Sequence, residues 1–369
     1  MTVRIGIDAG YLLPPHKSGV EMYTLNLVRA LLRLEERPRL YLYGAGPRPG
    51  PDTEGLWTAA ARTRLSSRTR LWLRLRMPAL MALDRVAVAH FPGGILPRVL
   101  PAPAVVTFYD LAALRYPGLY DPRELSYYDS LVPQAAHRAS AVIAISERTK
   151  ADAVTAFGLD QDKVIVTPLG VDPGFRPVPD AARSVRDKYG VGPGYILGSV
   201  GSGHPRKNLK AVVAAFELMP EAGVQLVIVG SVQRDQEARA LIEASPRRER
   251  IHVLGYIPET DLPAIYSAAG ALCFPSLFEG FGLPVLEAMA CGTPVVCSDA
   301  GALGEVAGDA AMVVEAENRP RIADALECVL TDERVRSDLT QRGLARAGQY
   351  TWDRTARLTL GAYEKACGR

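Results

Sequence analysis

Residues 279–287 read Glu-Gly-Phe-Gly-Leu-Pro-Val-Leu-Glu, and they follow directly on a short apolar run that ends near Phe274. An apolar run of this length is typical of a buried β-strand. Pro284 suits the first turn of a helix, and Gly292, two residues before another proline, suits its end. The stretch therefore predicts a strand, a glycine loop and a helix in succession, which is the repeating unit of α/β folds.

The same stretch predicts an anion site at the start of the helix. Gly280 and Gly282 let a ligand approach the backbone because neither residue carries a Cβ atom. The free N–H groups at a helix start attract phosphate, and here they belong to Phe281, Gly282 and Leu283. Glu279 would reach a neutral polyol beside that phosphate, and Glu287 would accept hydrogen bonds from the hydroxyls of a ribose. The alternative is that the two carboxylates only decorate a loop and complement the helix dipole.

Short apolar, β-branched runs alternate with helix-length segments along the whole chain, which predicts parallel sheets with helices on both faces. The expected strands are 3–8, 40–43, 86–90, 104–108, 141–145, 164–167, 195–200, 225–229, 251–254, 271–274, 294–297 and 311–314, and the clearest helices are 20–34, 209–219 and 284–291. Two sets of about six strands favour two doubly wound, Rossmann-like domains that face a deep cleft. The count alone leaves a closed eightfold barrel open.

The length of 369 residues and an apolar content of 48% also favour two folded domains. Residues 170–179 contain three prolines and two glycines without any periodicity, as expected of a linker. We therefore expect an acceptor-binding domain over 1–170, a linker over 171–185 and a nucleotide-binding domain over 186–350. Residues 351–369 should form a C-terminal helix that packs back on the first domain.

A net charge of +3 is too small to indicate nucleic-acid binding. Most of the basic excess lies in residues 57–85, where seven arginines accompany a single acidic residue, Asp84, and are interleaved with leucine, methionine and tryptophan. This stretch suits peripheral contact with an anionic membrane; the alternative is a solvated helix pair. Neither a signal peptide nor a membrane-spanning run is evident, and the five scattered cysteines are typical of a reducing cytoplasm.

A second motif, Gly-Ser-Gly-His-Pro-Arg-Lys-Asn at 201–208, follows the strand expected at 195–200. Asn208 is a good N-cap, so Arg206 and Lys207 would precede a helix N-terminus, where the dipole disfavours cations. An anion bound by both side chains and by the helix amides would explain why Arg206 and Lys207 lie there. The alternative is that the two residues are solvated surface cations. Gly19, at the start of the first helix, could similarly let a diphosphate approach the backbone, or it could be a simple turn.

No metal ion or cofactor is expected. The five histidines lack metal-ligand spacing, and Asp-Gln-Asp at 160–162 lies in a polar turn before a strand. The motifs of NTPases, serine hydrolases and zinc proteases are missing from the sequence.

Together these residues resemble the retaining glycosyltransferases of family 4, in particular a mannosyltransferase-like subgroup. The resemblance is carried by 279–287 and the Ala-Met-Ala-Cys-Gly-Thr-Pro-Val-Val-Cys-Ser run that follows it, with support from 205–209, 18–21 and 305–309. It implies a GT-B fold, a nucleotide-diphosphate-sugar donor such as GDP-mannose, and metal-independent transfer with retention. The acceptor is left open among a glycan, a lipid-linked precursor and a small molecule.

The resemblance also implies roles for individual residues. Arg206 and Lys207 would bind the diphosphate and stabilise the leaving group. Glu279 and the amides of Gly280, Phe281, Gly282 and Leu283 would hold the donor sugar and phosphates, Glu287 the ribose, and Ile257 the base.

One position departs from the family pattern. Related enzymes commonly carry a His-Asp pair after a strand of the first domain, where this chain has Tyr109 and Asp110. Either Tyr109 orients the sugar differently, or activity is altered or lost. His90 could substitute for the missing imidazole, although a packed core histidine is the simpler interpretation. The departure favours one alternative, a nucleotide-sugar-binding protein without transferase activity. A GT-B-fold nucleotide-sugar epimerase is a further alternative, although the sequence shows no cluster of carboxylates and a histidine for its acid/base chemistry.

Overall fold

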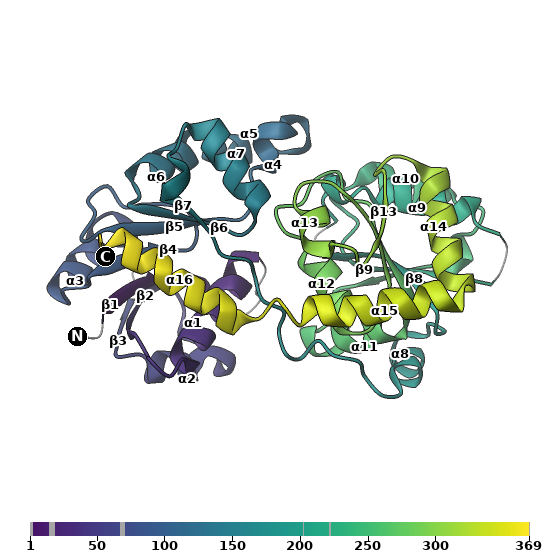
Figure 1. The fold of residues 1–369 in the computed structure, drawn as a ribbon, viewed down its shortest axis with the longest axis horizontal. Helices are drawn as coiled ribbons and strands as arrows, with labels where there is room; N and C mark the ends of the chain where they lie inside the picture. Colours follow the sequence, from purple (N-terminus) through teal and green to yellow (C-terminus); the bar gives the residue numbers. More distant parts are fainter. Residues whose placement is uncertain (1–2, 15–18, 67–70, 202, 221–222, 369) are drawn as a thin grey trace. The chain divides into compact units, whose positions relative to one another are not determined.

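The structure, a computed structural model, describes residues 3–14, 19–66, 71–201, 203–220 and 223–368. It divides into two compact α/β units (Figure 1). Unit 1 is Met1–Gly170 together with Thr351–Arg369, and unit 2 is Val171–Tyr350. The C-terminal residues thus belong to the same unit as the N-terminal ones.

Unit 1 contains a parallel seven-stranded sheet in the order β3-β2-β1-β4-β5-β6-β7. Its strands are β1 (Arg4–Asp8), β2 (Arg39–Ala45), β3 (Arg62–Ser66), β4 (Val88–Phe91), β5 (Ala104–Phe108), β6 (Ala141–Ala144) and β7 (Val164–Val166). The central strands β4, β5 and β6 are buried along their whole length, which explains their uninterrupted apolar sequences. The chain builds the sheet outward from β1 to β3 and then returns to place β4 on the other side of β1. The strand order therefore reverses between β1 and β4.

The helices of unit 1 are α1 (Gly19–Arg33), α2 (Pro51–Ala59), α3 (Met77–Leu83), α4 (Ala112–Arg115), α5 (Pro122–Ser126), α6 (Val132–Arg138), α7 (Glu147–Phe157) and α16 (Trp352–Ala366). Figure 1 shows α16, in yellow, lying among the purple and blue elements of unit 1. Its Trp352 ring packs edge-on against Tyr23 of α1, with ring centroids 6.1 Å apart.

His90 joins α16 to the sheet of unit 1. Its Nδ1 atom is 2.8 Å from the Tyr363 hydroxyl of α16, and its Nε2 atom is 2.9 Å from the Thr107 hydroxyl of β5. Burial lowers the pKa of His90 to about 3, so the imidazole is neutral at physiological pH. His90 is therefore the packed core histidine that the sequence favoured, and not a substitute for a catalytic imidazole.

The expectation of a solvated helix pair over 57–85 is wrong, because β3 lies within this range and forms the edge of the sheet. The buried carboxylate of Asp84 receives hydrogen bonds from Arg62, Arg64 and Tyr43. Burial alone would raise the pKa of Asp84, but the hydrogen bonds from Arg64 and Tyr43 outweigh it and lower the pKa. Two of the arginines in this stretch thus serve an internal ion cluster.

Unit 2 contains a parallel six-stranded sheet in the order β10-β9-β8-β11-β12-β13. Its strands are β8 (Tyr195–Gly201), β9 (Leu226–Gly230), β10 (Ile251–Gly255), β11 (Ala269–Phe274), β12 (Val295–Ser298) and β13 (Met312–Val314). Its helices are α8 (Ala181–Tyr189), α9 (Leu209–Leu218), α10 (Gln236–Ala244), α11 (Leu262–Ala268), α12 (Leu283–Ala290), α13 (Leu303–Ala307), α14 (Arg319–Thr331) and α15 (Glu333–Ala347).

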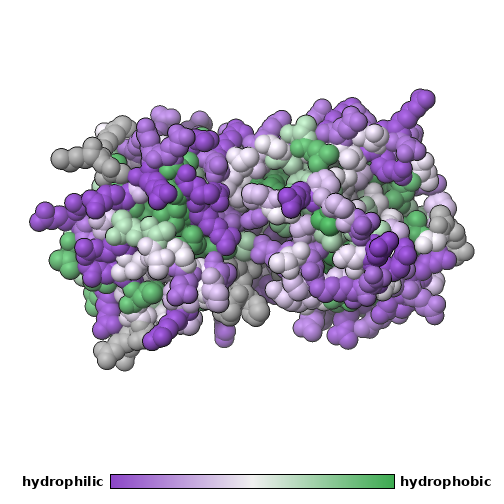
Figure 2. Space-filling view, turned by 90° about the horizontal axis from the view of Figure 1, so that it is seen from below, coloured by the Kyte–Doolittle hydropathy of each residue, from purple (hydrophilic) through white to green (hydrophobic). Residues whose placement is uncertain are grey.

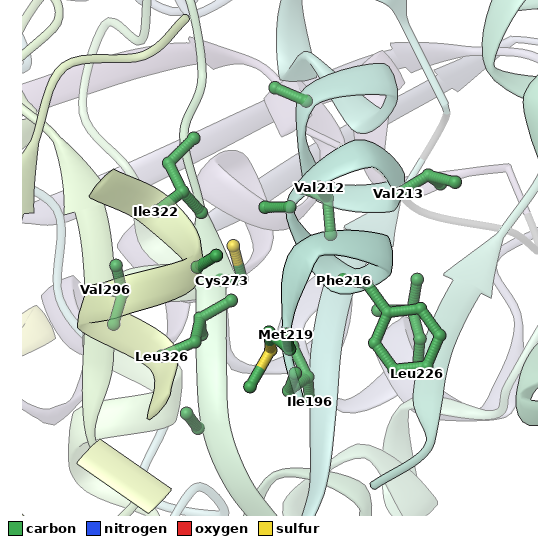
Figure 3. Packing of buried hydrophobic residues seen from close by; sticks show 14 of the residues in the cluster. Ile196, Val212, Val213, Phe216, Met219, Leu226, Cys273, Val296, Ile322 and Leu326 are labelled. Carbon is green, nitrogen blue, oxygen red and sulfur yellow. The ribbon is translucent and has the colours of Figure 1, made fainter. Parts of the chain in front are cut away.

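A buried cluster on one face of this sheet holds α9 and α14 against the strands (Figure 3). Phe216 of α9 and Leu326 of α14 each expose 2% or less of their surface, and they pack in one cluster with Ile196 of β8 and Cys273 of β11. Truncating a side chain of this kind to alanine typically costs about 2–5 kcal/mol. The core therefore fixes β8 and β11, the two strands whose ends carry the sequence motifs.

The range 171–185, expected as a linker, packs on unit 2. Helix α8 begins inside it at Ala181, and the buried ring of Phe175 lies 5.9 Å from the Tyr266 ring.

Within the described ranges no helix combines the length and the apolar character that a membrane span requires. Figure 2 shows a face on which hydrophobic residues are interspersed among hydrophilic ones.

Candidate functional site

The strand order of unit 2 reverses between β8 and β11. At such a switch point the loops that follow the two strands diverge, and ligands of open α/β sheets bind in the space outside the carboxyl ends of the strands. The described part of the loop after β8 is 203–208, and the loop after β11 is 275–282. The two strongest sequence motifs therefore flank one point of the fold.

Arg206 joins the two motifs. It lies in a single 3₁₀ turn (Pro205–Lys207), and its guanidinium is 2.5 Å from a carboxylate oxygen of Glu279 and donates a hydrogen bond to the Phe278 carbonyl. The second carboxylate oxygen of Glu279 accepts a hydrogen bond from Ser276 at 3.2 Å. Glu279 is 8% exposed, so this is a largely buried ion pair. The sequence placed both residues at the site but did not predict that they bind each other.

Lys207 points back toward the end of β8. Its Nζ atom donates to the Val200 carbonyl at 2.5 Å and lies 5.4 Å from the centroid of the Phe274 ring. Gly201 makes room for it, because a Cβ atom there would lie 2.9 Å from Nζ. Burial lowers the pKa of Lys207, while the negative charge of Glu279 acts in the opposite direction. An anionic ligand would stabilise this desolvated ammonium group electrostatically.

Glu287 lies in the second turn of α12 and accepts a hydrogen bond from the Tyr266 hydroxyl at 2.8 Å. Burial raises the pKa of Glu287 to about 7, although the Tyr266 hydrogen bond opposes this shift. The carboxylate is thus held in one orientation by a helix of its own unit, which suits it to accept hydrogen bonds from ligand hydroxyls. Tyr266 was missed from the sequence, since no local pattern marks it as the partner of Glu287.

The start of α12 has a glycine N-cap and closely packed flanking residues. Gly282 is the N-cap residue, with φ +107°, and the helix start has no side-chain cap. A Cβ atom at Gly282 would lie 2.5 Å from a methyl group of Leu303. The buried Phe281 ring packs on Tyr350, with centroids 5.8 Å apart. Gly280 and Leu283 flank these residues, so packing holds the backbone at the start of α12 in place.

Asn208 is a site residue whose role the sequence predicted wrongly. It precedes α9, but its φ is +57° and its side chain caps no N–H group of the helix. The amide instead donates to the carbonyls of Pro275 at 3.0 Å and Ala316 at 2.7 Å. Asparagine tolerates this left-handed conformation better than other non-glycine residues, which is the signal that could have revealed the role. Asn208 ties the loop after β8 to the segments that follow β11 and β13.

The remaining predicted residues lie elsewhere. Ile257 is buried just after β10. In unit 1, Gly19 is the first residue of α1 and has open space where a Cβ atom would be. Tyr109 follows β5 and donates a hydrogen bond to the Pro92 carbonyl at 3.0 Å, and Asp110 accepts one from the Ala112 amide at 3.2 Å. Across the described residues no group of three or more histidines, cysteines or acidic residues could hold a metal ion.

Comparison with known proteins identifies the family of this chain. Residues 183–346 match the family model "Glycosyl transferases group 1", and residues 17–175 match the model "Glycosyltransferase Family 4". The chain is 33% identical over 283 residues to O-antigen chain mannosyltransferase B of Escherichia coli, which covers 75% of this chain and 74% of that protein. It is 30% identical over 279 residues to the serotype-specific mannosyltransferase WbdA of Escherichia coli, covering 72% of this chain but only 34% of the relative.

A solved structure supports the fold. The Anabaena protein Alr3699/HepE in complex with UDP and glucose superposes with a TM-score of 0.75 over 98% of this chain and 99% of that one, at 18% identity. Two parallel-sheet domains of this kind form the GT-B fold. The chain therefore belongs to the group 1 and family 4 glycosyltransferases of GT-B fold, as a mannosyltransferase-like member.

Proposed function

We propose that this glycosyltransferase moves a mannosyl group from GDP-mannose to an acceptor hydroxyl, with retention of the anomeric configuration and without a metal ion. The observation that carries the proposal is the convergence of Arg206, Lys207, Glu279 and Glu287 around the switch point of unit 2. The names of the two Escherichia coli relatives support mannose as the sugar.

Different residues of unit 2 would bind different parts of the donor. Negative charge develops on the diphosphate as the glycosidic bond breaks, and prearranged cations and backbone N–H groups stabilise it without reorganisation. Lys207 and Arg206 would supply the cations, and the start of α12 would supply the amides. Glu287 would bind the ribose, Glu279 the transferred sugar, and Ile257 the base.

Unit 1 would bind the acceptor, and Gly19 would let the diphosphate approach backbone. Tyr109 and Asp110 are our candidates for contacting the reacting sugar. The hydrogen bond that Tyr109 donates to the Pro92 carbonyl would hold the phenol in one orientation for that contact. Substitution of Tyr109 by phenylalanine would then lower kcat more than it raises the KM of the donor.

A thermal-shift panel with GDP, UDP, ADP and dTDP tests the donor site. A ligand at 100 times its Kd stabilises a fold by about 2.7 kcal/mol. We expect GDP alone to raise the melting temperature of the wild type, and Lys207→Ala to abolish the shift. Lys210→Ala is the matched control, because Lys210 lies in α9 and pairs with Glu237 at 3.1 Å. Equal shifts in both variants would refute the assigned site.

The chemistry needs its own test. Product formed from GDP-mannose should carry an α-linked mannose by NMR, and saturating EDTA should leave the rate unchanged. A β-linked product would contradict retention, and a rate abolished by EDTA and restored by Mg²⁺ or Mn²⁺ would contradict metal independence.

We further propose that the protein works in the cytoplasm and contacts the inner face of an anionic membrane through residues 57–85, where a glycan precursor on a lipid would be reached. Trp57 and Trp72 are buried and contribute nothing to such contact. Exposed leucines support it instead: Leu65, Leu71, Leu75 and Leu83. Within the described part of this stretch, Arg74, Arg76 and Arg85 are exposed and form no ion pair. Their positive charges are therefore available to anionic lipid headgroups. Within the described residues no cysteine forms a disulfide, which suits a reducing compartment.

Vesicle sedimentation tests the membrane contact. The wild type should bind phosphatidylglycerol vesicles at low salt and not phosphatidylcholine vesicles, and the double variant Arg74→Ala, Arg76→Ala should bind less. Unchanged binding of this variant would locate the contact elsewhere, and no binding to either vesicle would eliminate it.

A further inference from the structure

Unit 1 has a switch point of its own, between β1 and β4, and nothing in the donor site accounts for the residues found there. The loop after β1 contains Tyr11, and the loop after β4 begins with residues 92–94. Strand β1 ends at Asp8, beside the paired strand β4. The same rule that locates the ligand of unit 2 predicts a ligand at this point.

The carboxyl group of Asp8 is half-buried and largely unused by the protein. One of its oxygens accepts a hydrogen bond from the Gly10 amide at 3.3 Å. The other has no hydrogen-bond partner, and Asp8 pairs with no lysine or arginine, within the residues that the structure describes. Desolvation raises the pKa of Asp8 to about 6. A carboxylate left in this state gains a hydrogen bond when a ligand hydroxyl approaches.

Tyr11 provides a donor next to this acceptor. Its ring covers Gly93, where a Cβ atom would lie 1.7 Å from the hydroxyl oxygen, so only glycine lets the ring lie there. Among the described residues its hydroxyl has no hydrogen-bond partner. Burial and the nearby Asp8 charge both raise the pKa of Tyr11, so the phenol keeps its proton.

The loop beneath Tyr11 is held by two further tyrosines. Tyr127 donates to the Gly93 carbonyl at 2.9 Å, and Tyr109 donates to the Pro92 carbonyl at 3.0 Å. The site thus presents an aromatic ring, one hydroxyl donor and one carboxylate acceptor on a fixed backbone. Hydroxyl-rich rings match this set, because they offer both donors and acceptors and a face for aromatic contact.

Charge narrows the ligand class. The Asp8 carboxylate is itself negatively charged when ionised, and among the described residues it pairs with no lysine or arginine. A phosphorylated or carboxylated ligand would be repelled, whereas a neutral sugar would not.

We propose that Asp8 and Tyr11 bind the acceptor, and that the acceptor's terminal residue is a neutral pyranoside whose hydroxyls accept from Tyr11 and donate to Asp8. This inference rests on the proposed function, because it assigns the second substrate of the same reaction. It selects a glycan terminus over a sugar phosphate or an acidic small molecule.

Saturation-transfer NMR on the full chain, without any donor, tests the proposal. The probes are the methyl α-pyranosides of mannose, glucose, galactose and N-acetylglucosamine, with mannose 6-phosphate as the anionic counterpart. The variants are Asp8→Asn and Tyr11→Phe. The control is Asp162→Asn, an aspartate in the turn before the edge strand β7. A thermal shift with GDP on every variant reports the donor site separately.

We expect at least one methyl pyranoside to bind the wild type and Asp162→Asn equally. Asp8→Asn removes the charge of the acceptor, so the Kd of this variant for the pyranoside should rise roughly tenfold to hundredfold. Tyr11→Phe removes one neutral hydrogen bond, so its Kd should rise roughly two- to tenfold. No binding of any pyranoside to the wild type, equal binding by Asp8→Asn, or tighter binding of mannose 6-phosphate would each overturn the proposal. A normal pyranoside result with no nucleotide shift would instead refute the donor assignment alone.

Discussion

Substituting Glu287 by glutamine should stabilise the ligand-free protein at alkaline pH while destroying its affinity for the donor. Burial raises the pKa of Glu287 from 4.5 to about 7 in the folded state. Folding therefore favours the protonated carboxyl, and the folded state loses stability as pH rises from about 4.5 toward 7. Glutamine keeps an oxygen to accept the Tyr266 hydrogen bond but carries no charge.

The expected change in the free energy of unfolding follows from the pKa shift of Glu287. A displacement of about 2.5 pKa units corresponds to about 3 kcal/mol at pH 8, where the carboxyl is ionised in both states. At pH 4.5 the difference between wild type and Glu287→Gln should fall below about 0.5 kcal/mol. The variant should thus be more stable at pH 8 and nearly unchanged at pH 4.5.

The chain offers separate probes for its two units. The three tryptophans, Trp57, Trp72 and Trp352, all lie in unit 1, so tryptophan fluorescence during urea unfolding is an internal control. The buried thiols of Cys273 and Cys297 lie in unit 2, and their labelling rate follows unfolding of that unit. Glu327→Gln, on the exposed surface of α14, is the matched variant. A stability change that is independent of pH, or lower stability of Glu287→Gln at pH 8, would show that folding does not raise the pKa of Glu287.

Four further substitutions test individual loop and helix positions. Asn208→Ala leaves the carbonyls of Pro275 and Ala316 without their donor and places alanine at positive φ, so urea unfolding should show a loss of roughly 3 kcal/mol. Gly203→Ala puts a Cβ atom 1.7 Å from the Ser231 carbonyl at φ +62° and should lower the thermal midpoint markedly, whereas Gly361→Ala, in open space within α16, should gain about 0.5–1 kcal/mol. Gly19→Ala should leave the thermal midpoint unchanged but weaken GDP-mannose turnover; unchanged kcat/KM would remove Gly19 from the donor site.

The central strands could be predicted because burial on both faces requires continuous apolar, β-branched sequence. The strand expected at 104–108 has those bounds as β5, and the other expected strands shift by one or two residues at their ends. Strand β3 could not be predicted, since Arg-Thr-Arg-Leu-Ser carries the polar residues of a sheet edge. Its arginines compensate Asp84, which is distant in sequence, and only the folded structure brings the three together.

In the candidate site, too, features with a local cause could be predicted, and contacts between distant residues could not. Glycines and a proline at a strand-to-helix junction have local conformational reasons, so 279–287 was recognisable as a loop and helix start. The pairing of Arg206 with Glu279 and of Tyr266 with Glu287 depends on which strand ends are adjacent, and that is a property of the sheet order. Asn208 was predicted wrongly because the N-cap preference of asparagine and its tolerance of positive φ act at the same position, and here the second decides.

Hydrogen exchange measured by mass spectrometry with and without saturating GDP locates the nucleotide on the chain. We expect slower exchange in 203–208 and 280–287, a smaller effect around Ile257, and loss of all three effects in Lys207→Ala. Protection confined to other segments, or none with GDP, UDP, ADP or dTDP, would contradict a donor site between β8 and β11.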